Sequence, residues 1–209
     1  ANQTRGVYTQ GINHPSPSTG TNLIEYSTFA TTGSRVDFGD LTDGTAASSS
    51  NASPTRGLFM GGSDGTSPNP AYTNRIDYIT IGTTGNAQDY GDLTGIRGYM
   101  YGGGNAIRAI ITSGYNGTGY LSTSETINMV TKGRGQIFGS TPLAGEYGAT
   151  MCSTTRFVYG AAYTYPAGRV NTIEYINIQT LGDSVNFGDL SVETARGDAR
   201  GYSNGHGGL

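Results

Sequence analysis

NRIDYITIGTTGNAQDYGDLT, residues 74–94, decides the fold, because related versions of this stretch occur three more times in the chain. The other copies are NLIEYSTFATTGSRVDFGDLT at 22–42, SETINMVTKGRGQIFGSTP at 124–142 and NTIEYINIQTLGDSVNFGDLS at 171–191. Their acidic residues are separated by 52, 48 and 49 residues, and so are the aromatic residues that precede Gly. A tandem repeat with a period near 50 residues is typical of propellers and solenoids.

Each repeat contains more than these two strands. An arginine followed by a short apolar strand occurs at 4–11, 55–62, 107–114 and 155–162, upstream of each acidic strand. A Gly- and Ala-rich segment follows the aromatic strand at 95–105, 144–155 and 194–205. We interpret these segments as inner strands, because small residues let backbones crowd around a narrow axis. The predicted order in each unit is inner strand, Arg strand, acid strand, aromatic-Gly-Asp strand.

The termini supply complementary parts of one unit. The chain ends in an inner strand and begins with an Arg strand, so 192–209 joined with 1–42 would complete a unit beside 43–94, 95–142 and 143–191. We therefore predict one all-β domain over 1–209, a β-propeller of four blades. Its ring closes where the C-terminal inner strand pairs with the N-terminal strands, which leaves no sheet edge exposed.

The strand IDYITI at 76–81 indicates how such sheets pack. Alternation puts Ile76, Tyr78 and Thr80 on one face and Asp77, Ile79 and Ile81 on the other. Large apolar groups on both faces predict a sheet covered by a neighbouring sheet on each side.

Composition narrows the classes of partner and site. The formal charge of −3 gives no reason to expect nucleic acid, and no apolar run is long enough for membrane insertion. No signal peptide is visible at the start of the sequence. With a single cysteine, Cys152, and only His14 and His206, the chain lacks the ligands of a Cys/His zinc site. We predict neither a metal site nor a cofactor.

GLFMGG, NRIDYITI and DYGDLTGIR resemble the kelch repeat, in which a Gly-Gly pair ends one strand and an acid and a Tyr lie in the next. More narrowly, the pattern is similar to the degenerate kelch-like repeats in virion and tail-fibre proteins of marine bacteriophages. The resemblance covers nearly the whole chain and implies a propeller in a virion. The third unit departs from it with Thr126 in place of Tyr and Ser140 in place of Asp, and the chain has no Trp.

One acid and one arginine recur in every unit, which is a structural rather than a catalytic pattern, since an enzyme needs one asymmetric constellation. We expect the acids to satisfy buried backbone donors or to form ion pairs with the arginines. The residues concerned are Arg5, Arg56, Arg108 and Arg156, with Glu25, Asp77, Glu125 and Glu174.

The linkers between the Arg and acid strands differ from unit to unit and should emerge on one rim. Tyr and Asn on rigidly held loops suit flat polar ligands such as sugars or a protein epitope, although solvated loops with incidental tyrosines would look the same. The candidate ligand-binding residues are Tyr72, Tyr115, Asn116, Tyr120, Tyr163 and Tyr165.

The leading hypothesis is a non-enzymatic phage virion protein, a receptor-binding or adhesive propeller of a tail fibre or spike that faces the cell exterior. Its partners would be a cell-surface glycan or protein receptor, or other virion subunits in a larger assembly. The alternatives are a capsid-decoration or connector protein and a carbohydrate-active enzyme. For the enzyme, Glu146 and Glu193 are the acids outside the repeated strands to test by mutation.

Overall fold

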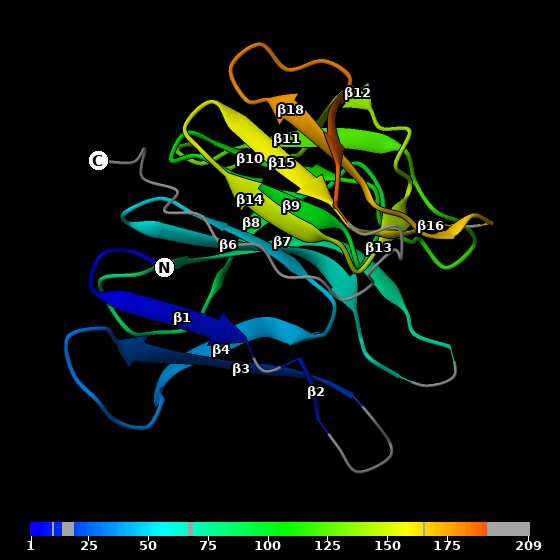
Figure 1. The fold of residues 1–209 in the computed structure, drawn as a ribbon. Helices are drawn as coiled ribbons and strands as arrows, with labels where there is room; N and C mark the ends of the chain where they lie inside the picture. Colours follow the sequence, from blue (N-terminus) through cyan, green and yellow to red (C-terminus); the bar gives the residue numbers. More distant parts are fainter. Residues whose placement is uncertain (10, 14–18, 67–68, 165, 192–209) are drawn as a thin grey trace.

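The computed structural model describes residues 1–9, 11–13, 19–66, 69–164 and 166–191. These residues form five antiparallel sheets and contain no helix (Figure 1). The predicted all-β class is therefore confirmed. Four of the sheets correspond to the four copies of the sequence repeat, and we number them in chain order.

The first sheet contains β1 (Arg5–Thr9), β3 (Thr19–Thr28) and β4 (Val36–Thr45), and β2 (Ile12–Asn13) pairs with the start of β3. The second contains β5 (Ser49–Ala52), β6 (Arg56–Ser63), β7 (Tyr72–Thr80) and β8 (Gln88–Asp92). The third contains β9 (Tyr101–Gly104), β10 (Arg108–Thr112), β11 (Thr123–Asn128) and β12 (Gln136–Ser140). The fourth contains β14 (Ala149–Cys152), β15 (Arg156–Gly160), β18 (Thr172–Asn177) and β19 (Val185–Asp189).

In the second, third and fourth sheets the spatial order of strands is the predicted one, from inner strand to aromatic strand. In the first sheet, β1, β3 and β4 occupy the Arg, acid and aromatic positions. The inner strand predicted for this sheet falls in 194–205, outside the described residues, and so does the predicted pairing that closes the ring.

A small fifth sheet was not foreseen from the sequence. It consists of β13 (Gly145–Glu146), β16 (Tyr163–Thr164) and β17 (Gly168–Arg169). The linker that follows β15 forms the hairpin of β16 and β17, and β16 pairs with β13. This linker is thus a paired element rather than an open loop.

The inner strands β5, β9 and β14 lie side by side, and glycine makes this possible. A Cβ atom on Gly102 of β9 would overlap the hydroxyl of Ser49 on β5. A Cβ atom on the next residue, Gly103, would overlap the thiol of Cys152 on β14. The prediction that small residues allow inner strands to crowd together is confirmed for these three strands.

A β-bulge explains the aromatic-Gly motif. In the second sheet, Ile76 pairs with Gly91 and Asp77 pairs with Asp89, so Tyr90 is the extra residue of β8. The same register shift precedes the acid in the other three sheets. Gly91 has φ of 141°, a conformation that side chains other than glycine rarely adopt.

Apolar cores fill the spaces between consecutive sheets. Ile79 and Ile81 pack with Phe38 of the first sheet, whereas Ile76 and Tyr90 belong to the core shared with the third sheet. The predicted division of this strand between two faces is confirmed. A third core lies between the third and fourth sheets. Each aromatic bulge residue from the first three sheets therefore faces the following sheet.

The repeated acid reaches back to the preceding sheet. Thr42 of the first sheet donates its hydroxyl to Asp77 Oδ1 at 2.8 Å. Thr94 likewise donates to Glu125 Oε1 at 2.6 Å, and Thr141 donates to Glu174 Oε2 at 2.8 Å. All three carboxylates are buried. The acids thus satisfy donors of a neighbouring sheet, because a buried carboxylate without hydrogen bonds is costly.

The repeated arginine reaches forward to the following sheet, where its Nη1 donates to two consecutive backbone carbonyl groups. Arg5 bonds to Ile81 and Gly82 (both 3.2 Å), Arg56 to Met129 and Val130 (both 2.9 Å), and Arg108 to Ile178 and Gln179 (2.8 and 2.7 Å). A charged donor bonded to two carbonyl groups makes a strong contact between sheets.

The predicted ion pairs take a different form. Among the described residues, Arg5, Arg56, Arg108 and Arg156 make no ion pair with Glu25, Asp77, Glu125 or Glu174. Different arginines approach three of these acids: Arg35 approaches Glu25, Arg75 approaches Asp77 and Arg97 approaches Glu125. The sequence analysis expected ion pairs between the repeated acid and arginine of one unit, whereas in the fold these residues form hydrogen bonds with neighbouring units.

Backbone contacts complete the connection between sheets. The amide of Gly85 donates to the carbonyl oxygen of Phe38 at 2.7 Å, and the amide of Gly133 donates to that of Tyr90 at 3.1 Å. A second bond, two residues further along, occurs between all consecutive sheets: Ala87 donates to Asp40 at 2.7 Å, Gly135 to Asp92 at 2.8 Å and Ser184 to Ser140 at 2.9 Å. We call the set of acid, arginine and backbone contacts between consecutive sheets a joint. The described part of the chain contains three joints, which connect the first sheet to the fourth through the second and third.

Candidate functional site

Five tyrosines from different segments form one continuous group of rings. Tyr72 lies 5.7 Å from Tyr115 and 6.4 Å from Tyr99, measured between ring centroids. Tyr115 lies 5.3 Å from Tyr120, and Tyr99 lies 5.3 Å from Tyr147. We call these five residues the tyrosine cluster. It joins the predicted linker tyrosines 72, 115 and 120 to two residues that precede inner strands.

The backbone at Tyr99 and Tyr147 is strained. Both residues are left-handed, with φ of 58° and 60°, and Ala47, at the same place in the second repeat, has φ of 54°. Tyr99 donates its amide to the carbonyl oxygen of Ala47 at 2.9 Å, which ties the two segments together. Left-handed backbone is unfavourable for bulky residues and persists where the surroundings hold it. The left-handed backbone is therefore a feature of three repeats, and in two of them it carries a ring of the cluster.

Glu146 of β13 binds the edge of the cluster. Tyr120 donates its hydroxyl to Glu146 Oε1 at 2.9 Å. Burial raises the pKa of Tyr120, and the hydrogen bond to Glu146 raises it further. The phenol of Tyr120 therefore stays neutral at physiological pH. The site combines aromatic faces with hydroxyl groups and one carboxylate, which suits a polar ligand that has an apolar face.

Tyr72 gives a spectroscopic test of the cluster. Burial, followed by the nearby Tyr99 and Tyr115, raises its pKa to about 12. We expect one tyrosinate absorbance step near that pH, and Tyr72→Phe should remove it. The folded state holds the phenol proton of Tyr72 more tightly than the unfolded state does. The contribution of Tyr72 to the free energy of unfolding is therefore complete below about pH 10 and is lost as pH rises toward 12. An unchanged titration curve for Tyr72→Phe would contradict this assignment.

The remaining candidate residues have different places. Asn116 accepts hydrogen bonds from the amides of Thr118 and Gly119, so its side chain shapes its own loop. Tyr163 is exposed on β16, where it is paired with Glu146 of β13. Tyr165 lies outside the described residues.

Sequence reasoning missed Tyr99, Tyr147 and Arg97. The two tyrosines each lie nine residues before the repeated arginine, so their equivalence was visible in the sequence, but inner segments were treated only as small-residue strands. Arg97 has a buried guanidinium that donates to Glu125 Oε1 at 2.6 Å and also bonds to the carbonyl oxygens of Ser113 and Thr123. An Arg-Gly pair also occurs in the segment at 194–205, as Arg196-Gly197 and Arg200-Gly201, but the sequence analysis considered only the small residues of these segments.

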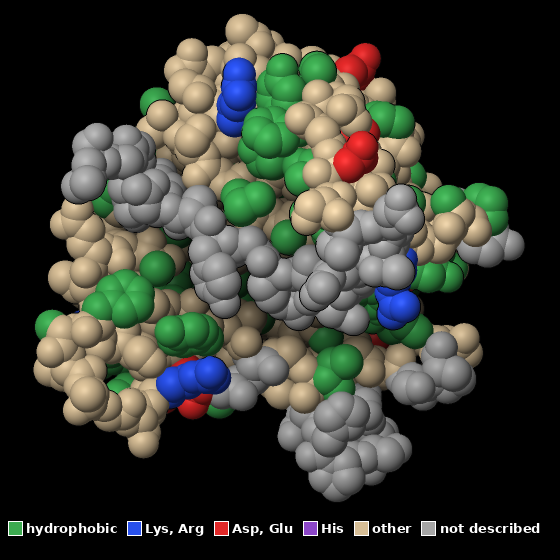
Figure 2. All heavy atoms as spheres, in the orientation of Figure 1, with side chains coloured by type: hydrophobic (Ala, Val, Ile, Leu, Met, Phe, Trp, Pro, Cys, Tyr) green, Lys and Arg blue, Asp and Glu red, His purple; other side chains and the backbone are tan. Residues whose placement is uncertain are grey.

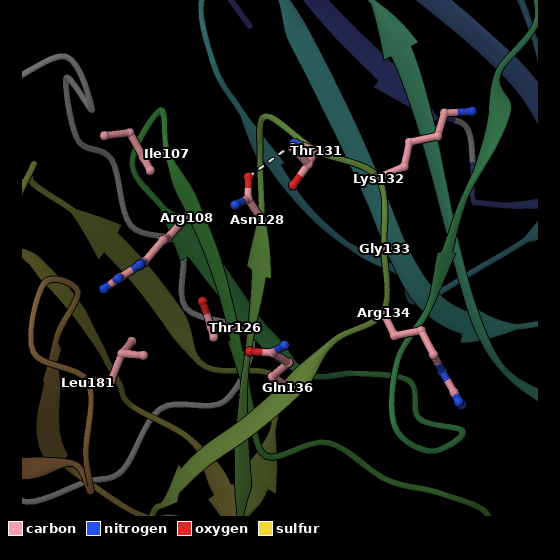
Figure 3. A pocket seen from close by; sticks show the side chains of 10 residues that line it. All are labelled: Ile107, Arg108, Thr126, Asn128, Thr131, Lys132, Gly133, Arg134, Gln136 and Leu181. Carbon is pink, nitrogen blue, oxygen red and sulfur yellow. Dashed lines mark hydrogen bonds between the residues drawn. The ribbon is translucent and has the colours of Figure 1, made fainter.

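A cavity of about 450 Å³ lies beside the hairpin of β11 and β12 (Figure 3). Two of its cations are already engaged: Arg108 binds the carbonyl groups of the fourth sheet, and Lys132 donates to the carbonyl oxygen of Asp89 at 3.0 Å. In Figure 3 the side chains of Lys132 and Arg134 point away from the centre of this space. We therefore place the candidate site at the tyrosine cluster.

Among the residues that the structure describes, there is no group of three or more His, Cys, Asp and Glu side chains that could hold a metal ion. The same residues include no helix that is long and apolar enough to cross a membrane.

No protein-family model and no curated protein matches this chain. The function proposed below therefore rests on the repeat, the joints and the tyrosine cluster.

Proposed function

We propose that this chain is a non-enzymatic phage virion protein, a receptor-binding or adhesive module of a tail fibre or spike. The observation that carries the binding role is the tyrosine cluster, in which rings from two linkers and two inner segments converge. The virion setting rests on the resemblance of the repeat to kelch-like repeats of marine phage proteins.

The proposal includes a propeller of four kelch-like blades. Support comes from the four similar sheets, the three joints between them and the crowding of β5, β9 and β14. In such a ring, 192–209 would provide the inner strand for the first sheet, as the order of strands in the other three sheets suggests.

The ligand would be a cell-surface glycan or a protein epitope. Tyrosine offers large contact area with little conformational freedom to lose, and its hydroxyl group both donates and accepts hydrogen bonds. Tyr147 and Tyr163 are the exposed tyrosines on this side, at 41% and 37% of their full accessible surface. A group of aromatic rings with hydroxyl groups favours recognition over chemistry.

A non-enzymatic role is supported by the use of the repeated acids. Asp77, Glu125 and Glu174 accept hydrogen bonds from threonines that hold consecutive sheets together. These carboxylates are buried in joints, where a substrate would have to separate two sheets to reach them.

The test is binding of the fluorescently labelled chain to a glycan array and to bacterial cells. Combining Tyr115→Ala with Tyr147→Ala should lower apparent affinity about tenfold or more, as expected for aromatic hot spots. Tyr8→Ala is the matched control, because Tyr8 is an exposed tyrosine on the first sheet that stacks with Arg35 outside the cluster. Its binding should be unchanged.

The result depends on intact folding, so melting curves of all variants should be compared first. Equal binding by the double variant and the control would overturn the receptor role of the cluster. If imaging of the intact particle then placed the cluster against another virion subunit, a decoration or connector role would replace adhesion.

A further inference from the structure

The three joints use the same positions of the repeat, and the fourth and first sheets each carry a further copy of one half that contacts no other sheet among the described residues. The forward half requires an arginine and a bulge aromatic, and the fourth sheet carries Arg156 and Phe187 at these places. The backward half requires an apolar residue four positions after the acid, followed by accessible carbonyl groups. In the first sheet that apolar residue is Phe29.

The aromatic side chains at these two places are much more exposed than the equivalent side chains inside the joints. Phe187 is 54% exposed, whereas Phe38 and Tyr90 are each 2% exposed. Phe29 is 57% exposed, whereas Ile81, at the same place in the second sheet, is 1% exposed. Large aromatic side chains thus lie open at the two ends of the series of sheets, whereas the internal bulge aromatics Phe38 and Tyr90 are buried and Phe138 is partly buried.

The polar contacts show the same difference. Arg156 lies over the ring of Tyr175 at 4.9 Å, as Arg5 lies over Tyr26 at 4.7 Å. Arg5 also bonds to two carbonyl groups of the following sheet. The guanidinium of Arg156 forms no hydrogen bond or ion pair with any described residue. The arginine is therefore positioned like its counterparts, with its carbonyl partners missing.

Glycine packing repeats the pattern once more. A Cβ atom on Gly91 would overlap the carbonyl oxygen of Gly133 in the next sheet, and one on Gly39 would crowd Gly85. Gly188 has the same strained backbone, with φ of 142°, but a Cβ atom there would meet no described atom within 4 Å. The space that a following sheet occupies in the internal joints is open here.

We infer that the fourth sheet binds the first sheet of the same chain through a fourth joint, in which Arg156 donates to the carbonyl groups of Phe29 and Ala30. Phe187 and Phe29 pack together in this joint, as Phe38 and Ile81 do in the first joint. The inference rests on the propeller fold proposed above and names the side faces that close it, in addition to any strand pairing by 192–209.

The covalent connection between the first and fourth sheets favours a partner within the chain. The first sheet lies at the bottom of the molecule and the fourth at the top, with the second between them (Figure 1). Hydrophobic side chains reach the surface over both end sheets on the side that Figure 2 displays. Because both halves belong to one polypeptide, their effective concentration exceeds that of a second copy in dilute solution.

Cross-linking tests this inference directly. Phe29→Cys and Phe187→Cys are combined in a Cys152→Ser background, in which serine preserves the acceptor for the amide of Gly104. A short bismaleimide should then link the two positions within one chain, giving a faster-migrating band of unchanged chain mass. Phe187→Cys with Val130→Cys is the negative control, because Val130 is equally exposed but belongs to the third sheet. It should give no such band.

A stability measurement covers the case in which the cysteines disturb packing. Arg156→Ala should lower the melting temperature by about 5 °C, as much as Arg108→Ala, which removes two known carbonyl contacts. Arg134→Ala, at an exposed position, is the control and should have no effect. A band of doubled mass would overturn the inference in favour of a head-to-tail second copy. No cross-link, together with an unchanged melting temperature for Arg156→Ala, would overturn both the joint within one chain and the head-to-tail contact between two copies. Neither readout involves receptor binding, so failure here is distinct from failure of the adhesive function.

Discussion

Replacing Glu125 with alanine should destabilise the protein by about 3–5 kcal/mol, because it leaves a buried arginine without its counter-charge. Glu125 has no exposed side-chain surface and Arg97 has 2%, and the two are joined at 2.6 Å. Burial lowers the pKa of Arg97, which Glu125 opposes by stabilising the charged form. The substitution also removes the acceptor for the amide and hydroxyl of Thr94. The single substitution therefore removes a buried ion pair and weakens the joint between the second and third sheets.

Urea unfolding monitored by tyrosine fluorescence would measure this loss. The control is Asp43→Ala, which breaks an ion pair with Arg75 in which the Asp43 side chain is 78% exposed. Exposed pairs contribute about 0–1 kcal/mol, so the control should be close to the parent protein. Equal losses for the two variants would show that the Glu125 pair is not buried as described.

Gly91→Ala should cost about 4 kcal/mol and loosen the second joint. The residue has φ of 141°, and its Cβ atom would overlap a backbone carbonyl oxygen of Gly133, which has no side chain to move aside. Backbone strain and overpacking each contribute about 1–3 kcal/mol. Hydrogen exchange should show the amide of Gly133, which bonds to the carbonyl oxygen of Tyr90, losing protection.

Gly85→Ala separates the two contributions. Gly85 has φ of 149°, but a Cβ atom there would meet nothing within 4 Å. Its cost should be the backbone strain alone, about 1–3 kcal/mol, and the protection at Gly133 should persist. If Gly91→Ala were no worse than Gly85→Ala, close packing of consecutive sheets would not be the reason for glycine at position 91.

The sequence was sufficient to predict what recurs locally. The four copies specified the order of strands, and alternation in IDYITI separated Ile76 from Ile79 and Ile81, as the structure confirms. Periodicity reports directly on which face of a strand is apolar. These predictions needed no information about how distant units meet.

Contacts between units were harder to predict. Asp77 is bonded to Thr42, a residue 35 positions earlier, and Arg56 is bonded to Met129, 73 positions later. Both acid and arginine recur at every repeat, so the sequence alone pairs them as well within one unit as between units. In the structure, Asp77 shares a face of β7 with Ile79 and Ile81, and this face packs against the first sheet. Tyr99 was missed because its role depends on a left-handed backbone that no propensity favours.

The joints have a direction: Asp77, Glu125 and Glu174 bond to the sheet before them, whereas Arg5, Arg56 and Arg108 bond to the sheet after them. A unit therefore has two different sides, and it can pack between its neighbours in one orientation only. A gene duplication that inserts one whole period keeps both sides matched, whereas an insertion of half a period leaves a carboxylate and a guanidinium buried without partners. Growth and loss of such a protein should thus proceed in steps of one complete unit.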